Sequence, residues 1–166
     1  FDKFEDLKKS PSIFISKDGL ASYYQWMIAE FGFTEAQVKP YTFNAQPFLA
    51  DKKSVMQGYL SSEPYAIESA AGFKPKVFLL ADYGFNTYST LIETRTELVT
   101  KNPDMVKRFV EASIIGWNNY LYGDNKAANE AIKKDNPDIT DEQIAFSISQ
   151  MKKFGIVDSG DTEKMG

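Results

Sequence analysis

The feature that most constrains the fold is an alternation of short β-prone runs with helical patterns in the first half of the chain. The expected strands cover residues 13–15, 38–43, 59–63 and 77–81, and the expected helices between them cover 20–31, 46–57 and 64–71. Alternation of this kind is typical of a mostly parallel sheet with helices on both faces. The sequence therefore predicts an α/β fold for residues 1–90.

The second half of the chain changes to helical patterns alone. Helices are expected at 103–121 and about 125–134, followed by a helix capped by Thr140 and stopped at Gly155. The first of these carries an apolar stripe at helical spacing, made of Val106, Phe109, Val110, Ile114, Trp117 and Leu121. We therefore expect residues 91–166 to form a helical segment, with a polar, frayed tail from Asp158.

Composition argues against a nucleic-acid partner and against a membrane-spanning segment. The chain has 166 residues, 43% of them apolar, so it can bury a core. Its net charge is −4 and it has no basic block, which argues against a nucleic-acid partner. No apolar run approaches the roughly 20 residues that span a bilayer. Because the chain begins at Phe1, without Met or a signal sequence, we expect a mature product or an excised piece.

The sequence has no histidine and no cysteine. This excludes Ser-His-Asp and Cys-His nucleophilic catalysis, thiolate redox chemistry, and the commonest protein ligands of zinc, copper and iron. Carboxylate-only catalysis and magnesium binding stay open as alternatives, but no cluster of Asp and Glu occurs at coordinating spacing, so we expect no cofactor and no metal. The residues point to recognition of a small molecule rather than to a reaction centre.

Candidate ligand-binding residues follow two of the expected strands. Ligands of open α/β sheets lie beyond the carboxyl ends of the strands, and here two polar, aromatic loops are predicted at such positions. The first run supplies Tyr59, Ser62, Glu63 and Tyr65, and the second supplies Tyr83, Asn86 and Tyr88. Ser16 and Asp18 follow the first expected strand and could present donors to the same ligand. The combination predicts a pocket for a flat molecule that forms hydrogen bonds.

Each candidate also has a purely structural interpretation. Glu63 could cap the short helix that Pro64 begins, and Tyr65 could be an ordinary core residue. The loop around Gly84 and Asn86 could be a plain turn. Ser16 or Asp18 could be a simple helix cap, which is the safer interpretation for both residues.

The order of these parts resembles the substrate-binding proteins of ABC importers, in the group that serves nitrate, sulfonates and thiamine pyrimidines. The residues that carry the resemblance are the Asp6-Leu-Lys-Lys segment leading to the strand at Ile15, the loop and helix from Ser16 to Phe31, the run from Gly58 to Tyr65, and the helix start Asn102-Pro-Asp-Met-Val-Lys-Arg-Phe-Val110. The resemblance covers essentially the whole chain, and its specificity comes from the order and spacing of these motifs together.

The resemblance implies a periplasmic-binding-protein type II lobe at residues 1–90, which binds a small solute in a cleft between two lobes and docks on ABC permease subunits. It implies a periplasmic or extracytoplasmic location. Family members are about twice as long, so the chain resembles a C-terminal fragment in which residues 91–166 would return to an absent first lobe. The apolar stripe of the helix at 103–121 would then favour self-association.

Glu63 decides which solute is favoured. A carboxylate would repel nitrate, a sulfonate or taurine, which need backbone N–H groups and cations. The amino group and ring of a thiamine pyrimidine precursor, or of another neutral heteroaromatic molecule, would suit a glutamate and tyrosines. Pyrimidine synthases that share this fold are the enzymatic alternative, but they use an active-site histidine and cysteine-rich segments, which this chain lacks. A sensory ligand-binding module is a third interpretation.

Overall fold

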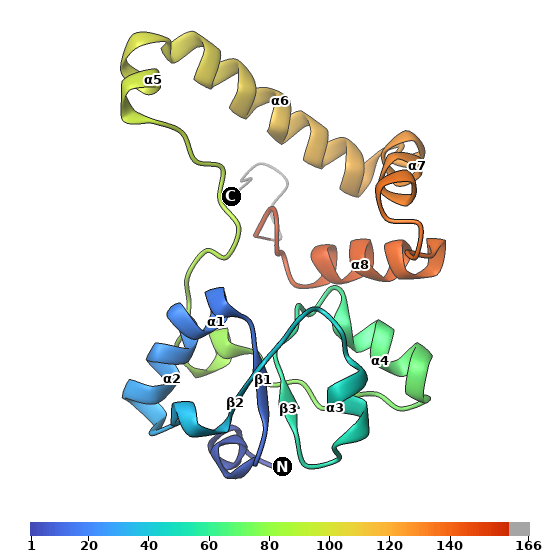
Figure 1. Ribbon diagram of the computed structural model, residues 1–166. Helices are drawn as coiled ribbons and strands as arrows, with labels where there is room; N and C mark the ends of the chain where they lie inside the picture. The colour runs from blue at the N-terminus through green and yellow to red at the C-terminus, as the bar shows by residue number, and fades with distance from the viewer. Residues whose placement is uncertain (160–166) are drawn as a thin grey trace. The chain divides into compact units, whose positions relative to one another are not determined.

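The computed structural model describes residues 1–159, which form two units (Figure 1). The first unit is Phe1–Thr87, and the second begins at Tyr88. In the described part of the chain, all strands lie in the first unit, and the second unit is helical. The predicted mixed α/β class with a parallel sheet is confirmed.

A three-stranded parallel sheet forms the centre of the first unit. Strand β1 (Ile13–Ile15) lies between β2 (Val38–Pro40) and β3 (Val55–Met56), and Ile13 is paired with Val38 on one side and Val55 on the other. The connections are α1 (Lys17–Ala21), α2 (Tyr23–Phe31), the short 3-10 helix η2 (Glu35–Gln37) and α3 (Gln46–Ala50), and α4 (Glu63–Ala71) follows β3. In the view of Figure 1, α1 and α2 lie on one side of the strands and α3 and α4 on the other.

The core of this unit is built around an aromatic residue at the start of the chain. Phe4 belongs to the 3-10 helix η1 (Phe4–Lys9), and its ring centroid lies 4.9 Å from that of Phe31 and 4.2 Å from that of Tyr83. The buried cluster comprises Phe4, Leu7, Ile13, Ile15, Tyr24, Met27 and Phe33. Because η1 packs against β1 and α2, the N-terminal residues stabilise the core that supports the sheet.

The expected helix at 46–57 and strand at 59–63 are both wrong. The helix ends at Ala50, because Asp51 forms an Asx turn in which its carboxylate accepts a hydrogen bond from the Lys53 N–H at 3.0 Å. The hydroxyl of Ser54 also donates to the Asp51 carbonyl at 2.7 Å. The strand therefore forms earlier, as β3, and residues 59–62 make a turn that leads into α4.

One further β assignment is also wrong. Residues 77–81 are not a strand: the chain is irregular up to the 3-10 helix η3 (Leu80–Tyr83), which Gly84 ends with φ +107°. The side chains of Phe78 and Leu80 pack against the Phe4 cluster, so this segment contributes side-chain burial and no strand pairing.

The second unit contains α5 (Thr96–Lys101), α6 (Pro103–Tyr122), α7 (Lys126–Asp135) and α8 (Asp141–Lys153). The predicted helices are thus confirmed within a few residues, and the Thr140 cap is confirmed because its side chain accepts a hydrogen bond from the Gln143 N–H. Asn102 precedes α6 as expected, although its side chain makes no capping bond.

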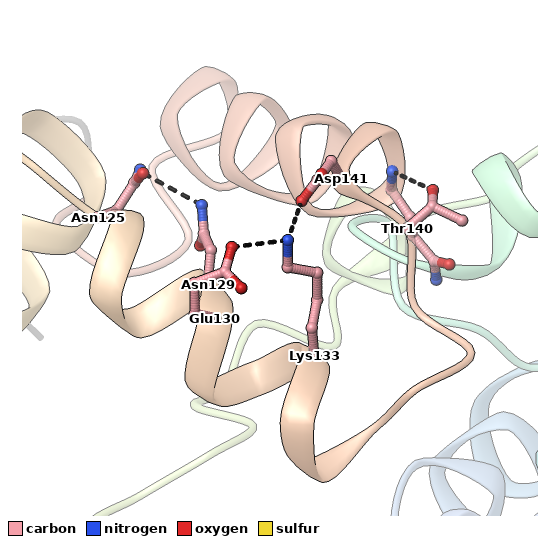
Figure 2. A network of polar contacts seen from close by, with 7 residues as sticks. Asn125, Asn129, Glu130, Lys133, Thr140 and Asp141 are labelled. Carbon is pink, nitrogen blue, oxygen red and sulfur yellow. Dashed lines mark hydrogen bonds and ion pairs between the residues drawn. The ribbon is translucent and has the colours of Figure 1, made fainter.

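An ion pair joins α7 to the start of α8, and a hydrogen bond between two asparagine side chains lies at the start of α7 (Figure 2). The Lys133 ammonium lies 2.8 Å from Glu130 on its own helix and 2.9 Å from Asp141 on α8. The Asn129 amide donates to the Asn125 side chain at 3.1 Å (Figure 2). Both carboxylates raise the pKa of Lys133 to about 12, so this connection stays charged at neutral pH.

The apolar stripe of α6 is largely exposed within the second unit. Leu121 is buried, whereas Phe109 is 60% and Trp117 is 40% exposed. The residue expected to begin a frayed tail is instead anchored: Asp158 is fully buried and its carboxylate accepts a short hydrogen bond from the Tyr122 hydroxyl. Residues 160–166, which belong to the same expected tail, lie outside the described residues.

Candidate functional site

The carboxyl ends of the three parallel strands place Ser16, Tyr41 and Gln57 at one edge of the sheet. Each is the first residue after its strand. The Tyr41 N–H donates to the Ile15 carbonyl at 3.0 Å, and the Gln57 N–H donates to the Phe14 carbonyl at 3.0 Å. The backbone is therefore still held by the sheet at the point where these side chains begin. In open α/β sheets this edge is where ligands bind.

One cluster of hydrogen-bonded residues at this edge is centred on the side chain of Gln57. Its Oε1 accepts hydrogen bonds from the Ser16 N–H at 2.6 Å and from the Tyr23 hydroxyl at 2.8 Å. Ser16 also caps α1, because its hydroxyl accepts from the Gly19 N–H at 3.1 Å. The ends of β1 and β3 and the first residue of α2 are thus joined through a single amide oxygen.

Gly19 allows this close approach. A Cβ atom at position 19 would lie 2.7 Å from Tyr23 Cζ and 2.9 Å from Gln57 Oε1, and closer still to the Tyr23 hydroxyl. Distances this short are not found between real atoms of this kind, so any larger residue would displace the Tyr23–Gln57 bond. Gly19 is itself buried.

A second cluster of hydrogen-bonded residues at the same edge is centred on Glu63. Its Oε1 accepts from the Tyr41 hydroxyl at 3.0 Å and its Oε2 accepts from the Tyr59 N–H at 2.7 Å. Gly58 makes room for the carboxylate, because a Cβ atom at position 58 would lie 2.9 Å from Glu63 Cβ. Glu63 is half-buried and points toward Tyr41 rather than into bulk water. We call Ser16, Tyr23, Tyr41, Gln57 and Glu63 the strand-end site.

The two tyrosines of the strand-end site are protonated at neutral pH, and burial raises the pKa of both further. Desolvation raises the pKa of Tyr23 above its usual value, and the neighbouring Tyr59 adds to the shift. Desolvation also raises the pKa of Tyr41, and the charge and hydrogen bond of Glu63 add to it. Both phenols are therefore hydrogen-bond donors at neutral pH, and they hold Gln57 and Glu63 in place.

The other candidates from the first loop and from α1 surround this site. Tyr59 contributes its N–H to Glu63, while its side chain is 55% exposed. Ser62 precedes α4 without a side-chain capping bond, and Tyr65 is half-buried in the first turn of that helix. Asp18 is exposed on α1, and its carbonyl accepts a hydrogen bond from the Ser22 hydroxyl. The ligand roles of these residues remain predictions.

The three candidates from the second loop have different environments. Tyr83 is half-buried and stacks on Phe4, with an angle of 20° between the rings, so its contacts are those of a core residue. Asn86 is exposed in the segment after η3. Tyr88 is 71% exposed and belongs to the second unit. The structure does not join these three residues to the strand-end site by any described hydrogen bond, and their ligand roles also remain predictions.

Sequence reasoning missed Tyr23, Tyr41 and Gln57. A signal for two of them was present, because Tyr41 and Gln57 directly follow short strands. Gln57 was hidden because the strand was placed at 59–63 instead of at β3, and Tyr41 because its strand was extended to residue 43. Tyr23 lies on α2 and reaches the edge only through the tertiary fold.

The second unit has a different concave surface. An open groove of about 510 Å³ is lined by residues of α7, α8 and the turn before α7, including Asn125, Asn129, Ile148 and Lys152. Within residues 1–159, Asn129 Oδ1 is the one buried side-chain oxygen or nitrogen without a hydrogen-bond partner. In the same residues, no group of three or more acidic side chains could hold a metal ion.

Comparison with family models gives a match to the NMT1/THI5 like family over residues 2–128. The chain belongs to this family. The match spans all of the first unit and continues through α6, so it includes every residue of the strand-end site. Comparison with curated proteins and with solved structures gives no significant match.

Membership of the NMT1/THI5-like family indicates a solute-binding role, in the range of nitrate, sulfonates and thiamine precursors. The family consists mainly of substrate-binding proteins of transport systems, and these are typically extracytoplasmic. None of the helices described for residues 1–159 has the length and apolar content that crossing a membrane requires.

Proposed function

We propose that this protein is the solute-binding component of an ABC import system and that it binds a neutral heteroaromatic solute, such as a thiamine pyrimidine precursor, at the strand-end site. In this proposal residues 1–90 are the ligand-binding lobe and residues 91–166 are a helical segment. The partners are the solute and the membrane permease subunits, and the site of action is the periplasm or another extracytoplasmic space.

The observation that carries the proposal is the environment of Glu63. Its two oxygens accept one hydrogen bond each from the protein, and a carboxylate offers about four lone-pair positions. Acceptor capacity therefore remains for a donor on a solute. Within residues 1–159 Glu63 forms no ion pair, so its negative charge is not neutralised by Lys or Arg.

This charge favours amino-bearing solutes over anions. An unpaired carboxylate repels nitrate or a sulfonate, whereas an exocyclic amino group donates a charge-assisted hydrogen bond to it. Tyr59, whose backbone N–H binds Glu63, has a largely exposed side chain that is open to contact with a solute. An aromatic surface at that place suits stacking of a flat heterocycle.

Titration of the full chain with 4-amino-5-hydroxymethyl-2-methylpyrimidine tests the proposal. We expect binding by isothermal titration calorimetry, and a loss of affinity of about 10- to 100-fold in Glu63→Gln, because a hydrogen bond to a charged group contributes about 1.5–3 kcal/mol. Glu68→Gln is the matched control, since Glu68 lies exposed on the same helix. Absence of binding at millimolar pyrimidine would refute the ligand assignment. Stronger binding of nitrate or taurine would show that the ligand is an anion or a sulfonate instead.

The proposal treats the protein as a binding protein and not as an enzyme. Its support is the absence of histidine and cysteine from the sequence, which removes the side chains that a pyrimidine-synthase-like reaction would use. Incubation with iron and oxygen, followed by mass spectrometry, distinguishes the two classes. Formation of a pyrimidine product by the chain itself would make it an enzyme.

A further inference from the structure

The orientation of the Gln57 side chain is fixed by its neighbours. A backbone N–H can only donate, so the atom that faces the Ser16 N–H at 2.6 Å must be the amide oxygen. The Tyr23 hydroxyl donates to the same oxygen at 2.8 Å. If the amide rotated by 180°, its NH₂ would face the Ser16 N–H, so that bond would be lost and two donors would oppose each other. Its nitrogen therefore has one fixed direction.

That nitrogen is left without a partner. Among residues 1–159, no acceptor lies within hydrogen-bond distance of Gln57 Nε2. It is also not among the buried unpaired atoms of the described chain, so it is accessible to solvent. The strand-end site thus presents two N–H donors on a side chain whose position the sheet and Tyr23 already hold.

We propose that Gln57 is a specificity-determining residue of the strand-end site, and that its Nε2 donates a hydrogen bond to an acceptor atom of the solute. This inference rests on the proposed function and deepens it. The recognised solute combines an acceptor, such as a ring nitrogen or a carbonyl oxygen, with a donor that Glu63 accepts. Heteroaromatic rings with an exocyclic amino group carry both.

The two hydrogen-bonded clusters of the site are adjacent in the chain and share neighbours. Gly58 lies between Gln57 and Tyr59 in the chain, and its missing Cβ makes room for Glu63. Tyr59 donates to Glu63 and is also close enough to Tyr23 to affect its titration. The donor of Gln57 and the acceptor of Glu63 therefore lie at the same edge of the sheet, where a single solute could engage both.

Gln57→Glu tests the inference with a nearly isosteric change. A glutamate keeps an oxygen for the Ser16 N–H and the Tyr23 hydroxyl, and it replaces the free NH₂ donor by a second acceptor. Gln46→Glu is the control, because Gln46 is exposed on α3 and the substitution adds the same negative charge. Both variants and the native chain are titrated with 4-amino-5-hydroxymethyl-2-methylpyrimidine, nitrate and taurine. In parallel, the Gln57 side-chain NH₂ signal of the native chain is followed by ¹H–¹⁵N NMR.

We expect the bound pyrimidine to shift the NH₂ signal of Gln57 in the native chain. Its affinity for Gln57→Glu should be at least tenfold lower than for the native chain, and its affinity for Gln46→Glu should be unchanged. If only nitrate or taurine binds and shows this dependence, the donor role of Gln57 stands, whereas the pyrimidine ligand and the solute donor opposite Glu63 are both wrong. If the pyrimidine binds Gln57→Glu as tightly as the native chain, or leaves the NH₂ signal unmoved, the inference is overturned while the proposed function stands. Binding of none of the three probes overturns both.

Discussion

Replacing Tyr41 by phenylalanine removes one oxygen atom from the strand-end site and leaves the ring in place. Tyr41 is only 7% exposed, so its ring burial should be preserved. The loss is the 3.0 Å hydrogen bond to Glu63. Bonds to charged groups contribute about 1.5–3 kcal/mol. Because Glu63 is half-buried, water can replace part of this bond, and we expect Tyr41→Phe to lower the free energy of unfolding by about 1–2 kcal/mol.

Urea and thermal unfolding measure this effect. For a chain of this length, about 1–2 kcal/mol corresponds to a decrease in Tm of roughly 2–8 °C. Tyr59→Phe is the matched control, since the ring of Tyr59 is exposed and its hydroxyl makes no described hydrogen bond, so its effect should stay within about 0.5 kcal/mol. If the two variants unfold together, the Tyr41–Glu63 bond does not stabilise the site and the account of its geometry is wrong.

Three other predictions concern the same unit and α6. Gly58→Ala should weaken binding of the pyrimidine probe in calorimetry, because the added Cβ would displace Glu63; unchanged binding would show that the carboxylate needs no such space. Tyr23 and Tyr41, whose pKa values are raised in the folded state, contribute their stability fully below about pH 10, and this contribution is lost as pH rises further. The free energy of unfolding measured by urea titration should therefore fall above about pH 10, and less steeply in Tyr23→Phe and Tyr41→Phe. Phe109→Glu should reduce self-association in sedimentation velocity, and a native chain that stays monomeric at high concentration would contradict this expectation.

The fold class could be predicted because periodicity reports which faces are buried. The long helix α6 has twenty residues of helical pattern between Pro103 and Gly123, and its bounds are nearly correct. The sheet was harder, because its strands have two or three residues each, too few to show alternation. Local polar bonds at Asp51 decided where α3 stops, and they shifted the following strand by several residues.

The candidate site could be predicted only in outline. Glu63 was selected because it stands at the end of the strand expected at 59–63, and although that strand does not form, the structure places Glu63 among polar side chains at the sheet edge. The phenol that binds it, Tyr41, is 22 residues away in the chain, and no pattern in the sequence connects the two. Tyr83 shows the opposite case: an aromatic residue in a polar loop packs into the core because Phe4 offers it a flat partner.

The buried carboxylate of Asp158 sets a practical limit for anyone who shortens or labels this chain. Its oxygen accepts a hydrogen bond from the hydroxyl of Tyr122, the last residue of α6, so the segment after α8 is tied to the end of α6. A truncation before position 158 would leave that phenol without its acceptor and remove a fully enclosed side chain. Tags, dyes or fusion partners at the carboxyl end should therefore be attached after this anchor, with a spacer.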